Sequence, residues 1–90
     1  MLNELTTKTI EAITATGNHP RSCAGKIAGS LDIDALETLA AEVGQDRFSR
    51  QVAHYRNGNH ATTAAAHLRD IRIFAESHIA KGLREAGYNL

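Results

Sequence analysis

The sequence has few of the residues that stabilise small proteins by cross-links or large aromatic cores. Among 90 residues it contains one cysteine, one proline, no tryptophan, two tyrosines and two phenylalanines. A single cysteine, Cys23, excludes an internal disulfide and fits a reducing compartment. Strands rely on aromatic and β-branched residues, whereas this apolar content comes mainly from alanine, leucine and isoleucine. The composition therefore predicts an all-α protein.

Neither charge nor hydropathy points to a nucleic acid or a membrane. Ten Lys and Arg residues balance ten Asp and Glu residues, so no overall field attracts DNA, RNA or anionic lipid. No apolar run approaches the roughly 18 residues of a membrane span, and no signal peptide opens the chain. We expect a cytoplasmic protein without a membrane partner, and the charge balance weighs against nucleic-acid binding.

The longest periodic segment runs from Asn59 to Gly87. Its apolar residues recur at three- and four-residue steps and form one stripe: Ala64, Leu68, Ile71, Ala75, Ile79 and Leu83. Asn59 is suited to cap the start of this helix, and Gly87 to end it. At about 1.5 Å per residue the helix would span roughly 40 Å. Since so small a chain cannot cover that length by itself, we expect a partner helix.

Four shorter helices are predicted before it. They are Leu5–Thr16 ending at Gly17, a weak helix over Cys23–Leu31 capped by Ser22, Asp32–Val43 with a capping-box-like Asp34 and Glu37, and Asp46–Arg56. The turn at residues 57–59 predicts that the last two helices form an antiparallel αα-hairpin. The expectation is one all-helical domain over residues 1–90 that forms a homo-oligomer through this hairpin.

No pattern typical of catalysis or metal binding stands out. None of the histidines has the i, i+4 partner that a zinc-binding helix uses: His54, His60, His67 and His78. Cys23 with nearby His19 is more typical of a small core residue than of a nucleophile with its base. We therefore expect no enzymatic activity, no metal and no cofactor.

Arginines gather on both sides of the turn at residues 57–59: Arg47, Arg50, Arg56, Arg69 and Arg72. Free N–H groups at the start of the long helix suit a phosphate, and an aromatic ring beside them suits a base. The candidate ligand-binding residues are Arg50, Tyr55, Arg56, His60, Thr63 and Arg69, with Lys26 and Arg21 ranked second. A solvated charged face with scattered ion pairs is the alternative interpretation.

The segment AAAHLRDIRIFAESHIA, Ala64 to Ala80, resembles the hairpin domain shared by small phage anti-CBASS and anti-Thoeris sponge proteins. That family has a helical pattern close to A-x-T-x-L-x-x-[AG]-x-M-[WAF]-x-x-x-x-[AIV]-A. The matching positions are Ala64, Leu68, Phe74, Ile79 and Ala80, with Ile73 at the methionine position. Ala66 stands where threonine is usual, and Ile71 where a small residue is expected.

The resemblance covers roughly residues 60 to 81 and implies a function without catalysis. It implies an all-α homo-oligomer that sequesters cyclic oligonucleotide immune signals between its protomers. The matched positions are mostly packing positions, so no functional residue carries over from the family.

Two other functions stay open from the sequence. An overlong amphipathic helix in a neutral chain equally suits a small inhibitor or adaptor that binds a host protein. Residues 24–44 have a faint helix-turn-helix pattern, but the segment that would read DNA, residues 32–42, is acidic and is repelled by phosphate. A sponge holds a small nucleotide, whereas an adaptor needs a macromolecule.

Overall fold

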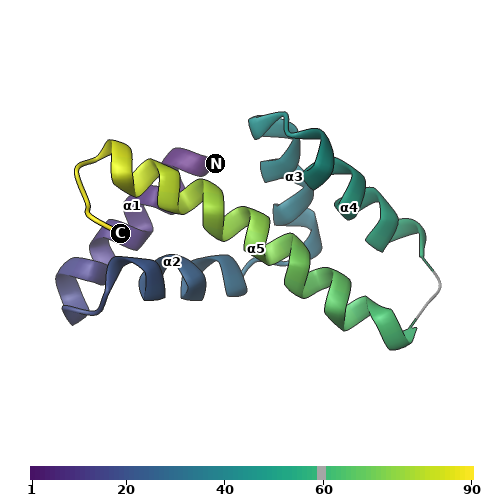
Figure 1. The fold of residues 1–90 in the computed structure, drawn as a ribbon, viewed down its shortest axis with the longest axis horizontal. Helices are drawn as coiled ribbons and strands as arrows, with labels where there is room; N and C mark the ends of the chain where they lie inside the picture. Colours follow the sequence, from purple (N-terminus) through teal and green to yellow (C-terminus); the bar gives the residue numbers. More distant parts are fainter. Residues whose placement is uncertain (59–60) are drawn as a thin grey trace.

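The computed structural model describes residues 1–58 and 61–90, and the side chains of residues 61–65 are not described. Within these residues the chain forms five α-helices and no strand (Figure 1). They are α1 (Leu2–Thr16), α2 (Pro20–Gly29), α3 (Ile33–Val43), α4 (Asp46–Asn57) and α5 (Ala61–Glu85). The all-α prediction is confirmed. The predicted cap Asn59 lies outside the described residues.

None of the helices described combines the length and the apolar character needed to cross a membrane.

The ends of α1 and α3 are set by glycine. Gly17 and Gly44 follow these helices with φ angles of 67° and 68°, in the left-handed region that glycine adopts without strain. Both stops were predicted from the sequence. The start of α1 was not, because the N–H of Leu2 donates to the Glu42 carboxylate of α3 at 2.7 Å. This long-range contact satisfies a free N–H group and extends the helix beyond the predicted Leu5.

The predicted caps of α2 and α3 are wrong by a few residues. His19 caps α2, since its Nδ1 accepts from the N–H of Arg21 at 3.1 Å, and Pro20 is the first helical residue. Asp32 caps α3 by accepting from the N–H of Ala35 at 2.8 Å. Ser22 and Asp34 therefore lie inside their helices rather than at the caps.

Helix α5 runs through the middle of the structure, with α1 and α2 on one side and α3 and α4 on the other (Figure 1). Its buried residues are Ile71, Ala75, Ile79, Ala80 and Leu83, all 0% exposed. Except for Ala80, they join a core that includes Ala28 of α2, Leu36 of α3 and Phe48 of α4. Between Ile71 and Leu83 the other helices of the same chain thus cover the apolar stripe of α5. The length of α5 therefore does not require a partner helix over this range.

Small residues let α5 approach its neighbours closely. A Cβ atom at Gly82 would lie 2.7 Å from Oγ1 of Thr6 in α1, and one at Gly25 would lie 2.6 Å from Oε1 of Glu76. The Thr6 hydroxyl donates to the carbonyl of Leu2 at 2.9 Å, so it cannot turn aside without losing that hydrogen bond. Gly82 therefore sets the spacing of α1 and α5.

Replacing Gly82 by alanine is expected to destabilise the protein by about 1–3 kcal/mol, because overpacking outweighs the better helix propensity of alanine, about 1 kcal/mol. Urea unfolding followed by circular dichroism measures the change. Thr6→Ala removes the clashing atoms, so the double variant Thr6→Ala/Gly82→Ala is expected to be more stable than Gly82→Ala. A Gly82→Ala protein more stable than the wild type would contradict the contact.

Candidate functional site

Aromatic rings line the contact between α4 and α5. The rings of Phe48 and Phe74 stack with their centroids 5.6 Å apart, and Phe48 also stacks on His78 at 6.0 Å. Nearer the end of α4, the His54 ring meets the edge of His67 at 4.8 Å. Such ring pairs add a directional contribution to apolar burial. They fix how the polar residues beside them on α4 and α5 are placed.

A hollow of about 460 Å³ lies beside these rings, and we call it the α4/α5 hollow. The described residues that line it are Arg47, Arg50, Gln51, His54 and His67. None of them is acidic, and neither arginine has an ion-pair partner within the described part of the chain. The Arg47 guanidinium lies 6.0 Å from the centre of the Phe74 ring, within the range of a cation–π contact. The hollow is therefore a site of positive charge.

Gln51 adds a neutral polar group to this wall. Its Oε1 is buried and has no hydrogen-bond partner among the described residues. Leaving a buried acceptor unpaired costs about 1–3 kcal/mol. Because this oxygen is buried, the groups that the wall presents to an incoming anion are the two arginines.

The residues predicted as a site do not gather at the turn. Arg50 lines the α4/α5 hollow, whereas Arg56 turns to α3, where it pairs with Asp34 and, through Nε, with Glu37 at 2.7 Å. The hydrogen bond that Arg56 donates to Asp34, with the charges of Glu37 and Asp34, raises the pKa of Arg56 above its ordinary value. Its charge is compensated within the chain, which disfavours it as a phosphate ligand. Tyr55 is half-buried against the core.

His60 and the side chain of Thr63, both predicted as ligand-binding, lie outside the described residues.

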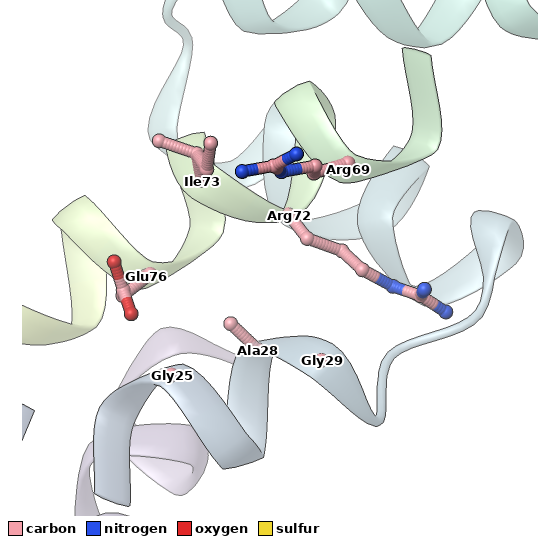
Figure 2. Close-up of a pocket in the computed structure, with 7 residues that line it drawn as sticks. All are labelled: Gly25, Ala28, Gly29, Arg69, Arg72, Ile73 and Glu76. Atoms are coloured by element: carbon pink, nitrogen blue, oxygen red, sulfur yellow. The ribbon is translucent and has the colours of Figure 1, made fainter. Parts of the chain in front are cut away.

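The other predicted arginines lie around a second hollow, of about 240 Å³, which we call the α2/α5 hollow. It is lined by Gly25, Ala28, Gly29, Arg69, Arg72, Ile73 and Glu76 (Figure 2). Arg72 extends away from Ile73 and donates through Nε and Nη2 to the carbonyl of Leu31, at 3.3 and 3.1 Å. Arg21 pairs with Glu76 at 3.3 Å, and Lys26 is exposed on α2 outside the lining.

Sequence reasoning did not select Gln51, His54 or His67 as site residues. A signal was present, because Arg47, Arg50, Gln51 and His54 are spaced at three and four residues and share one face of α4. His67 had no such signal, since only the packing of α5 on α4 brings it to His54. In the described part of the chain, no three His, Cys, Asp or Glu side chains group as a metal site would need.

The seam between α4 and α5 predicts a pH dependence of stability through His78. Its ring bonds to Oε1 of Gln45 at 2.8 Å, and burial, with the nearby charge of Lys81, lowers the pKa of His78 below its ordinary value of 6.5. A group whose pKa is lower in the folded protein takes up its proton more readily when unfolded. The free energy of unfolding is therefore expected to fall as the pH drops below about 6.5.

Urea unfolding from about pH 7.5 to about pH 5 measures this dependence. The control is His78→Gln, which keeps a hydrogen-bonding side chain but does not titrate. The free energy of unfolding of the wild type is expected to decrease relative to that of His78→Gln as the pH falls. A constant difference between the two proteins would contradict the assignment to His78.

No protein-family model, curated protein or solved structure matches this chain. The resemblance of residues 64–80 to the sponge proteins therefore rests on the sequence pattern. Of its matched positions, Ile79 and Ala80 are buried and Phe74 is half-buried, whereas Ile73 is 49% exposed. A function for this chain has to come from the residues that line its hollows.

Proposed function

We propose that this protein binds a phosphate-bearing molecule of the nucleotide class in the α4/α5 hollow and holds it without converting it. The observation that carries the proposal is the lining itself: Arg47 and Arg50 stand beside two histidines, with no carboxylate among the described lining residues. The planar fork of a guanidinium matches the oxygens of a phosphate and binds them bidentately. A site with two such forks favours a phosphodiester or a pair of phosphates.

The uncharged part of the lining supports a nucleotide rather than inorganic phosphate. The rings of His54 and His67 offer a surface on which a base can stack. A volume of about 460 Å³ falls in the range of small-molecule sites, roughly 300–1,000 Å³.

In this proposal α4 and α5 act as an antiparallel hairpin whose seam provides the site. The biological role follows the resemblance of residues 64–80: a cytoplasmic protein that lowers the free concentration of a cyclic oligonucleotide immune signal. Support for that role comes from the sequence pattern, whereas support for an anionic ligand comes from the lining of the hollow. The described lining belongs to one chain, so binding there does not depend on a second copy.

Isothermal titration calorimetry with a panel of cyclic di- and trinucleotides tests the proposal. Replacing Arg47 and Arg50 together by alanine is expected to weaken binding by about 100-fold or more, because each hydrogen bond to a charged group is worth about 1.5–3 kcal/mol. Arg84→Ala removes one positive charge from an exposed position in the last turn of α5 and is expected to leave affinity unchanged. Affinity is also expected to fall with added salt.

Arg56→Ala distinguishes a ligand site in the α4/α5 hollow from one at the turn at residues 57–59. The α4/α5 hollow predicts unchanged affinity, because Arg56 is paired with carboxylates of α3. Loss of binding in Arg56→Ala with retention in the Arg47/Arg50 variant would instead place the ligand at the turn. If no nucleotide binds to the folded wild type, the proposal fails and a protein partner becomes the better hypothesis.

Mass spectrometry of the released ligand tests the absence of conversion. The nucleotide is expected to be recovered intact after long incubation with the protein. A shortened or linearised product that depends on His54 would contradict a binding role.

A further inference from the structure

The α2/α5 hollow carries a net positive charge. Its lining holds two arginines, Arg69 and Arg72, and one carboxylate, Glu76, which pairs with Arg21 at 3.3 Å. Arg69 is exposed and has no ion-pair partner within the described residues. Arg72 donates to the carbonyl of Leu31, a neutral group that leaves the charge of the guanidinium uncompensated. The hollow therefore attracts an anion.

An apolar surface lies next to these charges. Ile73 is a large aliphatic residue, yet its side chain is 49% exposed at the rim of the hollow. Arg69 precedes it by one turn of α5, so the two residues line the same side. Across from them, Gly25, Ala28 and Gly29 of α2 form the floor (Figure 2). An anion bound by Arg69 would thus have an aliphatic surface beside it.

Gly29 keeps one end of the floor open without serving the packing of the chain. It has a helical backbone within α2, and a Cβ atom added there would meet nothing within 4 Å. Gly25 differs, because its Cβ atom would lie 2.6 Å from Oε1 of Glu76. Glycine is a poor helix former. At position 29 its effect is therefore to leave space that a molecule outside the chain can fill.

We propose that the α2/α5 hollow binds a carboxylate joined to a short branched aliphatic group. The carboxylate accepts from Arg69, with the charge of Arg72 nearby, because a guanidinium fork matches two carboxylate oxygens. The aliphatic group lies on the glycine floor against Ile73 and removes the exposed part of that side chain from water. Two molecules have this chemistry: a peptide that ends in leucine, isoleucine or valine, and a free short-chain acid.

The size and lining of the hollow favour such a ligand over a nucleotide. Its volume of about 240 Å³ lies below the roughly 300–1,000 Å³ of most small-molecule sites, so it suits a ligand of amino-acid size. None of the described lining residues is aromatic, so a base would have no ring on which to stack. The two hollows share no lining residue, and this site does not depend on the function proposed for the other.

A ¹H–¹⁵N NMR titration of the full chain with N-acetyl-glycyl-leucine tests the proposal. We expect shifts at the backbone amides of Gly25, Gly29, Arg69 and Ile73. The C-terminal amide of the same peptide has the same shape without the charge, and N-acetyl-glycyl-serine has the charge without the aliphatic group. Each is expected to bind about tenfold more weakly or worse, because hydrogen bonds to a charged group and aliphatic burial each contribute more than about 1.4 kcal/mol.

A parallel titration with 4-methylpentanoate distinguishes the two sources of the ligand. This acid keeps the carboxylate and the branched chain but has no peptide group. An affinity equal to that of N-acetyl-glycyl-leucine would support a free acid as the ligand. A tenfold or greater preference for the peptide would support a peptide C-terminus.

Two variants test the placement of the ligand. Arg69→Gln removes the exposed guanidinium, and Gly29→Leu fills the open end of the floor. Each is expected to weaken binding of N-acetyl-glycyl-leucine about tenfold or more. Arg84→Gln removes one positive charge from an exposed position in the last turn of α5 and is expected to leave the affinity unchanged. Circular dichroism verifies that the three variants are folded.

Three results would overturn the proposal. The first is that neither N-acetyl-glycyl-leucine nor 4-methylpentanoate shifts the amides of the hollow. The second is that the peptide acid and its amide bind equally well, because the arginines would then have no part in binding. The third is full affinity in both folded variants, Arg69→Gln and Gly29→Leu, because the ligand would then lie elsewhere.

Discussion

The burial of one side of α5 is the constraint on which the other features depend. From Ile71 to Leu83 one side of this helix is covered by the four helices around it, and each fully buried large aliphatic side chain contributes about 1.5–3 kcal/mol. The approach of α1 and α2 is close because glycines stand where side chains would collide. Once the buried side is fixed, the two flanks of α5 are fixed as well, one against α4 and the other against α2.

These flanks differ in chemistry because different residues of α5 reach them. The flank toward α4 carries His67 beside two arginines of α4, and its described lining has no carboxylate. The flank toward α2 carries Arg69 and Glu76 around Ile73, so its charges are mixed. The first arrangement suits an anionic ligand, whereas in the second Glu76 is already paired with Arg21 of α2. One helix thus presents two flanks of different charge.

Local patterns in the sequence predict the helices well, because propensity and periodicity act over a few residues. The stripe of α5 and the stops at Gly17 and Gly44 follow from spacing and from the conformational freedom of glycine. The early start of α1 at Leu2 could not be predicted in this way, because it depends on Glu42, which is forty residues away along the chain.

The site was predicted less well for the same physical reason. Arg56 was selected as a phosphate ligand because it stands near a helix start, but packing of α4 on α3 gives it two carboxylate partners. His67 was passed over because nothing in its own segment shows that it meets His54. The face of α4 that carries Arg47, Arg50 and Gln51 was readable from spacing, whereas the element opposite it had to come from the fold.

The most direct test of the central claim is a ¹H–¹⁵N NMR titration of the protein with a cyclic dinucleotide. The account predicts shifts confined to the two walls of the α4/α5 hollow, at Arg47, Arg50, Gln51, His54 and His67. Shifts centred on Arg56 and α3, or none at saturating nucleotide, would contradict the assignment of this hollow as the ligand site.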